Sequence, residues 1–195
     1  IFEIENCKMV YSNYTVYNYI KKTKKKAFKH NLPNGTITQD LINFYCVGLL
    51  TIAFKRDVFF EFQQFDNQFH IIGDFDIVLK ISSKYRIGCI NRELATYRLH
   101  KKNESNLKRN IRCKEMSLWL NSYFVKKNLN HMSLEKIEND IIYCNAVTNI
   151  LKGKKILVLK SIFNIKSNWL KFRLITMICI PSFIAKLINT YRLNN

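Results

Sequence analysis

The spacing of apolar residues changes near residue 105, and this change limits the folds open to the chain. Before it, short apolar runs alternate with turns, as in "CKMVYSNYTVYN" (7–18), whose alternation and Val, Tyr and Thr content predict a strand. After it, apolar residues recur every three or four positions, which is the period of a helix. The sequence therefore predicts an α/β part over residues 1–105 and an α-helical tail over residues 106–195.

Further elements are expected from local patterns of apolar residues, turn residues and helix caps. Those of the first part are a charged loop (21–35), a helix capped by Thr38 (38–46), a buried strand (48–56), a helix (57–66), a helix opened by Asp74, and one or two strands (86–100). In the tail, Ser133 is expected to cap a helix that carries Glu135 and Glu138 near its start.

The chain is strongly basic, with 32 Lys and Arg against 14 Asp and Glu, a net charge of +18. This charge favours polyanionic partners: nucleic acid, an anionic membrane surface or a phosphorylated substrate. The densest cluster, "KKTKKKAFK" (21–29), is interpreted either as a solvated loop or as a contact to anionic lipid or to a lipid-diphosphate acceptor.

Six cysteines lie at positions 7, 46, 89, 113, 144 and 179, and no two form a C-x-x-C pair. A zinc cluster is therefore not expected. Their apolar neighbours predict reduced, buried thiols in a cytoplasmic protein.

The stretch "FHIIGDFDIVLKIS" (69–82) holds the D-x-D pair Asp74 and Asp76 among apolar residues. Asp74 could be a helix N-cap, whose oxygen accepts an unpaired backbone N–H. The pair could be a metal site, but only if the helix starts after Asp76, since the two side chains otherwise point to different sides. Asp74 could also be a general base, because two nearby carboxylates shift each other's pKa.

Three blocks in order give the sequence a resemblance to family 2 glycosyltransferases, inverting enzymes with the GT-A fold. The blocks are "VGLLTIAFKR", "FDNQFHIIGDFDIVLKIS" and "INRELATYRLHKKNES", which together cover about a third of the chain. The family pattern has an acidic pair in the second block, but Gly73 stands where its first acid is expected. The resemblance implies an α/β fold that is the C-terminal, acceptor-side half of a GT-A nucleotide-sugar transferase domain.

The resemblance implies roles for four residues, and two more could assist one of them. Asp74 matches the general base, and Asp76 matches a structural or substrate-positioning residue. Gly48 matches a glycine of the acceptor-side loop. His100 matches the histidine that approaches the metal and the diphosphate, where Arg98 and Lys101 could add positive charge. From its neighbours alone, His100 is interpreted as a surface histidine next to basic residues.

Stretches similar to the family's nucleotide-binding strand and metal-binding D-x-D do not occur before residue 69. We therefore expect a fragment that lacks the nucleotide-binding half and does not bind a nucleotide-sugar alone. The implied cofactor is a divalent cation, Mg²⁺ or Mn²⁺, whose main D-x-D ligands lie outside this chain. The implied partners are a nucleotide-sugar donor, a saccharide or lipid-diphosphate acceptor and the missing N-terminal half, with no nucleic acid.

The C-terminal stretch between Arg173 and Lys186 has 12 uncharged residues, fewer than the roughly 20 that a membrane-spanning helix needs. With Trp169, Phe172 and flanking Lys and Arg, it could lie in a membrane interface, or it could be an ordinary core helix. The first alternative places the protein on the cytoplasmic face of the cell membrane. A different class of function also stays open: a non-catalytic basic module that binds nucleic acid or anionic membrane.

Overall fold

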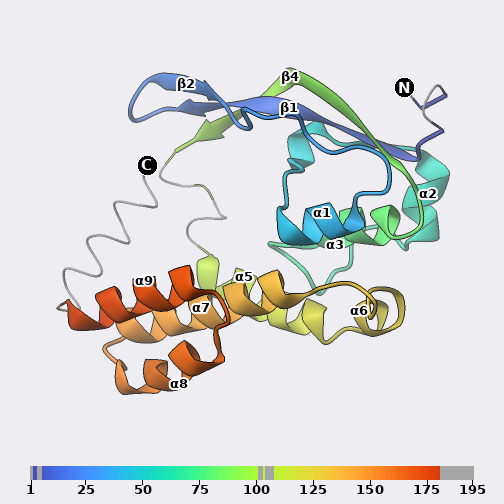
Figure 1. Cartoon of the computed structure of the whole chain (residues 1–195). Helices are drawn as coiled ribbons and strands as arrows, with labels where there is room; N and C mark the ends of the chain where they lie inside the picture. Colours follow the sequence, from blue (N-terminus) through green and yellow to red (C-terminus); the bar gives the residue numbers. More distant parts are fainter. Residues whose placement is uncertain (1, 4–5, 101–102, 104–107, 181–195) are drawn as a thin grey trace.

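The computed structural model describes residues 2–3, 6–100, 103 and 108–180, and its architecture is mixed α/β (Figure 1). A sheet lies at one side of the molecule, the helices α1 (Thr38–Asn43) and α3 (Gly73–Ser82) lie next to it, and the helices of the tail form a further layer. The α/β class predicted from the spacing of apolar residues is confirmed.

The sheet is built around β1 (Met9–Asn18), as the alternation over residues 7–18 predicts. β1 pairs in parallel with β4 (Ile87–Leu99), from Met9 beside Ile87 to Asn18 beside Leu99. On its other edge β1 pairs antiparallel with β2 (Thr23–Lys26) and β3 (Ala53–Phe54). Residues 86–100 therefore supply one long strand.

The basic cluster is not the loop that was expected, because part of it forms β2. A hairpin forms because the side-chain oxygen of Asn18 accepts the backbone N–H groups of Ile20 and Lys21, while Lys22 adopts a left-handed conformation with φ 52°. All four residues of β2 are exposed, so its lysines project into solvent from the edge of the sheet.

Two further expectations for the first part are wrong. Residues 48–56 do not form a buried strand: they form the 3-10 turn η1 (Leu49–Thr51), whose Leu49 is 54% exposed, and then the two-residue β3. Thr38 does not cap α1, whose N-cap is Ile37; its hydroxyl instead donates to the carbonyl of Ser82 at 2.7 Å and so ties α1 to the end of α3. The helix expected over 57–66 is α2 (Arg56–Glu61).

The tail forms helices, as expected: α5 (Arg109–Leu120), α6 (Tyr123–Asn128), α7 (Glu135–Leu151), α8 (Ile156–Asn164) and α9 (Asn168–Cys179). Ser133 does not cap α7, whose N-cap is Leu134. Among the described residues, none of the helices is both long and apolar enough to cross a membrane. The first part of the uncharged C-terminal stretch belongs to α9, which ends at Cys179. The part from Pro181 onward lies outside the described residues.

The apolar core consists of two clusters, and the division between them falls inside α7. The first cluster packs the sheet, α1 and α3 against Trp119 of α5, Val125 of α6 and Ile137 of α7. The second joins the later part of α7, from Ala146, to α8 and α9. The first core thus extends well beyond residue 105.

The expectation of six reduced, buried thiols is wrong at three positions. Cys113 of α5 and Cys144 of α7 form a disulfide, with their Cα atoms 6.4 Å apart, and Cys179 is exposed. Cys7, Cys46 and Cys89 are buried thiols, as expected.

Candidate functional site

The start of α3 is fixed by a carboxylate from another helix. Glu115 of α5 is 6% exposed and accepts the backbone N–H groups of His70, Ile71 and Ile72 at 3.0, 2.8 and 3.1 Å. Negative charge is favourable at this end of a helix, and three charge-assisted hydrogen bonds hold the loop in place. Glu115 therefore sets the position of Asp74, the second residue of α3.

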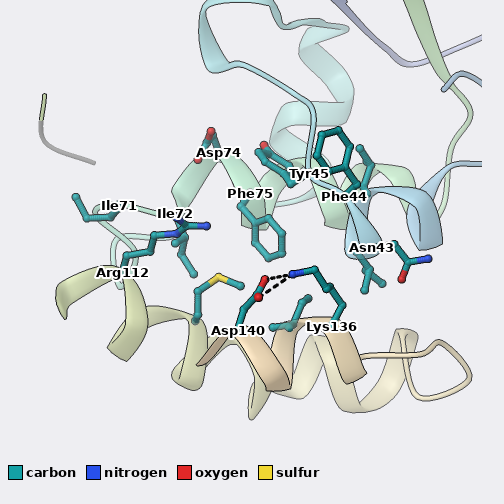
Figure 2. A pocket seen from close by; sticks show the side chains of 14 residues that line it. Asn43, Phe44, Tyr45, Ile71, Ile72, Asp74, Phe75, Arg112, Lys136 and Asp140 are labelled. Carbon is teal, nitrogen blue, oxygen red and sulfur yellow. Dashed lines mark hydrogen bonds and ion pairs between the residues drawn. The ribbon is translucent and has the colours of Figure 1, made fainter. Parts of the chain in front are cut away.

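Asp74 lies at the wall of a cavity of about 330 Å³ between α1, the start of α3, α5 and α7 (Figure 2). The cavity combines an apolar surface with a few polar groups, which is typical of small-molecule sites. The lining residues are Leu41, Ile42, Asn43, Phe44, Tyr45, Ile71, Ile72, Asp74, Phe75, Arg112, Met116, Lys136, Ile137 and Asp140.

The Asp74 carboxyl has a raised pKa. Burial is the largest cause, and the N–H groups of Phe75 and Asp74, the charge of Arg112 and the Tyr45 hydroxyl offset it in part. Asp74 is not a helix cap, because the N-cap of α3 is Ile72. A carboxylate whose pKa is raised toward neutrality takes up a proton more readily, as a general base must.

Tyr45 lines the cavity, and its hydroxyl is buried on the side of Asp74 (Figure 2). Burial, followed by the charge of Asp74, raises the pKa of Tyr45 well above 10, so the hydroxyl stays protonated and can donate. It lies close enough to influence Asp74, yet it makes no hydrogen bond of acceptable geometry with any described residue. A buried donor without a partner is costly, and the Asp74 carboxylate beside it is the acceptor that would satisfy it.

The opposite wall of the cavity is formed by the tail. Arg112 of α5 extends toward the start of α3, and Lys136 and Asp140 of α7 form an exposed ion pair at 2.6 Å (Figure 2). The cavity therefore exists only where the first part of the chain meets the helical tail.

Asp76 has a different environment from Asp74. Its side chain is buried and accepts hydrogen bonds from Lys80 Nζ at 2.6 Å and from Trp119 Nε1 at 3.1 Å. Because α3 starts at Gly73 and not after Asp76, the two carboxylates do not meet the condition for sharing one cation. The contacts of Asp76 are those of a structural residue that joins α3 to α5.

Gly48, Arg98 and His100 do not line the cavity. Gly48 packs so closely on Tyr14 that a Cβ added there would lie 2.9 Å from Cε1 of that ring. Arg98 and His100 are exposed at the end of β4. Lys101 lies outside the described residues.

The turn after β4 is closed by the side chain of Asn103. Its oxygen accepts the N–H of His100 at 2.5 Å, and its nitrogen donates to Tyr97 Oη at 3.0 Å and to the carbonyl of Arg98 at 3.2 Å. Asn103 of the third sequence block is therefore tied to the end of β4.

The first and third sequence blocks meet at Tyr14 of β1. Gly48 of the first block packs on its ring, and Tyr97 of the third block lies 6.4 Å away between ring centroids. Burial, followed by the charges of Tyr97, Cys46 and Asp74, raises the pKa of Tyr14. Residues far apart in sequence are thus gathered on one side of the sheet.

A cation site is not assembled by this part of the chain. Within the residues that the structure describes, no three His, Cys, Asp or Glu side chains are grouped as metal ligands. Of the ligands implied by the resemblance, only His100 belongs to this chain, so the divalent cation remains an expectation.

The patterns that identified Asp74 did not identify Tyr45, Arg112 or Glu115. Tyr45 and Arg112 lie in short helical patterns with nothing to set them apart, and Glu115 is one of several charged residues on α5. The other charged residues of α5 are basic, and Glu115 is the exception. This exception was the one signal in the sequence that the Glu115 carboxylate could be buried with a partner.

Comparisons of the chain with protein-family models, with curated proteins and with solved structures found no match. The resemblance to family 2 glycosyltransferases accordingly rests on the three sequence blocks.

Proposed function

We propose that this chain is the acceptor-side part of an inverting glycosyltransferase. It would act with a nucleotide-binding half to transfer a sugar from a nucleotide-sugar to a hydroxyl of a saccharide or lipid-linked acceptor. The observation that carries the proposal is the position of Asp74, a carboxylate with a raised pKa beside a buried, unsatisfied hydroxyl at the wall of a cavity.

In the proposed reaction the acceptor hydroxyl enters the cavity and hydrogen-bonds to Asp74. Its oxygen attacks the anomeric carbon, its proton passes to the Asp74 carboxylate, and the electron pair of the broken C–O bond leaves with the nucleoside diphosphate. Tyr45, buried beside Asp74, helps to hold that carboxylate in place, and Arg112 supplies positive charge at the same wall. The apolar residues Ile71, Ile72 and Phe75 suit an apolar part of the acceptor.

The experiment measures release of nucleoside diphosphate from a panel of nucleotide-sugars, with Mn²⁺ and lipid-diphosphate or saccharide acceptors. It uses the protein in which this chain is joined to its nucleotide-binding half. Asp74→Asn should lower turnover by about 10²–10⁴-fold, the usual contribution of a general base. Near-UV circular dichroism, which reports the buried Trp119, should be unchanged.

Asp140→Asn is the matched control, because Asp140 also lines the cavity but is exposed and paired with Lys136. Its turnover should remain within a few-fold of the parent. Full turnover in Asp74→Asn would refute the proposal.

The net charge of +18 supports a second candidate, a non-catalytic basic module that binds nucleic acid. This alternative predicts no transfer, and binding to duplex DNA whose affinity falls steeply with salt.

A further inference from the structure

The helices α8 and α9 expose large apolar side chains on their solvent-facing sides. Seven of the eighteen exposed large apolar residues of the described chain belong to these two helices, and the two most exposed are Phe163 at 83% and Ile156 at 82%. The seven are Ile156, Leu157, Leu159, Phe163, Trp169, Phe172 and Ile175. Surface helices usually present polar residues to solvent, so this pattern indicates a surface that has a partner.

The spacing of these residues produces a stripe along each helix. On α8 the outward positions Ile156, Leu159 and Phe163 follow the three- and four-residue helical repeat, while Val158 is buried against α7 and α9. On α9 the rings of Trp169 and Phe172 stack with centroids 6.1 Å apart.

The ends of the two helices are held together. The amine of Lys155, just before α8, donates to the carbonyls of Ile178 and Ile180 at the end of α9, each at 2.6 Å. Cationic groups are favourable at this end of a helix. The two stripes thus belong to one packed unit, whose interior consists of the buried side chains of the second core cluster.

The sequence that forms the two stripes carries charge of a single sign. After Asp140 it contains nine Lys and Arg residues and no Asp or Glu. Lys160 is exposed between Leu159 and Phe163 on α8, and Lys154 is exposed just before α8, whereas Lys166 pairs with Glu135 of α7 at 3.4 Å. Lysine is depleted in protein–protein interfaces, whereas a Lys-rich helix with exposed Trp and Phe is typical of binding to anionic lipid.

We propose that α8 and α9 form a docking surface for an anionic phospholipid bilayer. The apolar stripes enter the boundary between headgroups and acyl chains, and the lysines contact lipid phosphates. At 9 and 12 residues these helices are too short to span the bilayer and lie along its surface. The proposal is independent of sugar transfer, because lipid binding is measured without donor or acceptor.

The two tryptophans make the test specific, since Trp119 is fully buried and Trp169 is 65% exposed. The protein is mixed with vesicles of phosphatidylcholine alone or with phosphatidylglycerol added, some of them carrying brominated acyl chains. When anionic vesicles are added, the emission of Trp169 should shift to the blue. When those vesicles carry brominated acyl chains, the emission should also be quenched. Trp169→Phe should remove the shift, and binding should weaken as salt rises.

The variant Phe163→Ser with Phe172→Ser keeps this reporter and should weaken partition onto anionic vesicles by roughly tenfold or more. The matched control is Leu118→Ser with Tyr123→Ser, which removes side chains that are 59% and 74% exposed on α5 and α6. The control should bind as the parent does, and thermal unfolding should show that both variants are folded.

Three results would overturn the proposal. The first is that the parent does not bind anionic vesicles at low salt. The second is that the parent and the Phe163→Ser, Phe172→Ser variant bind equally well. The third is that the parent binds no vesicles but sediments as a dimer, whereas the variant sediments as a monomer. The last result would assign the surface to a second copy of the chain.

Discussion

Asp74 and Asp76 are two residues apart in sequence, yet they have different environments. The helical repeat turns Asp74 to the cavity wall and Asp76 into the contact between α3 and α5. Burial raises the pKa of both carboxyls, but Asp76 is paired with Lys80 and Trp119, whereas Asp74 is only partly buried and lies at the cavity wall. This difference makes Asp74 the candidate for chemistry and Asp76 the candidate for stability.

The raised pKa of Asp74 predicts a cost in stability that depends on pH. The folded protein holds the Asp74 proton to higher pH than the unfolded chain does, so stability falls as pH rises from about 4 through the folded-state pKa. Asp74→Asn should therefore be more stable than the parent at pH 7, by about 0.5–2 kcal/mol, and equal to it at low pH. Urea unfolding at several pH values measures this. A difference that does not vary with pH would contradict it.

Asp76→Ala should lower the free energy of unfolding by about 3–5 kcal/mol, because it leaves Lys80 and the Nε1 of fully buried Trp119 without this acceptor. Urea unfolding followed by Trp119 fluorescence measures the loss. Asp140→Ala is the matched control, since it removes another i,i+4 Lys–Asp pair, with side chains 50% and 53% exposed. Its cost should be at most about 1 kcal/mol. Equal losses in the two variants would mean that the contacts of Asp76 are not structural.

At the scale of elements, α5 connects the two parts of the chain. Glu115 holds the loop before α3, Trp119 bonds to Asp76, Arg112 reaches the cavity, and Cys113 is joined to α7. One helix of the tail therefore positions the start of α3. A change in the packing of α5 would therefore displace Asp74 even if the residues next to Asp74 in the sequence stayed the same.

The disulfide between α5 and α7 should stabilise this arrangement. It closes a segment with a sequence separation of 31, for which loop-closure entropy gives about 3–4 kcal/mol. Cys113→Ser with Cys144→Ser, or a reducing agent, should lower stability by about that amount in urea unfolding. Cys179→Ser, at an exposed thiol, should have no effect. Alkylation of all six cysteines in the urea-unfolded protein without reductant would contradict the disulfide.

The elements differ in how far the sequence could predict them. β1, β4 and α3 have long, regular apolar patterns and were predicted with nearly correct bounds. β2 was missed because its four lysines carry no alternation, and its pairing depends on the turn made by Asn18. Residues 48–56 look like a strand, but the close packing of Gly48 on Tyr14 and the 3-10 turn that follows interrupt it.

The candidate site was predicted only in part, for a related reason. Asp74 stands out in a local pattern, whereas Tyr45, Arg112 and Glu115 act through contacts with residues more than 25 positions away. Periodicity describes one element at a time, so it could not show that α5 faces the start of α3. The pairing of Cys113 with Cys144 was missed in the same way.

At the scale of the whole molecule, the position of the two core clusters predicts where the chain can be shortened. A chain that ends at residue 105 loses Glu115 and Trp119, which complete the first core, and should not fold. A chain that ends at Leu151 keeps that core and exposes part of α7, including Val147 and Ile150, so it should fold with a lower melting temperature. Circular dichroism of both chains measures this. Cooperative unfolding of the 1–105 chain would contradict the prediction.

The parallel pairing of β1 with β4 also constrains the order in which the protein folds during synthesis. Met9 cannot find Ile87 until α1, α2 and α3 have been made, so β1 must wait for its main partner. The hairpin with β2 needs only nearby residues and can form early. During that interval the free side of β1 is open to other strands, and the lysines of β2 place positive charge beside it. Positive charge at a strand edge is one of the features that keep such an edge from pairing with another chain.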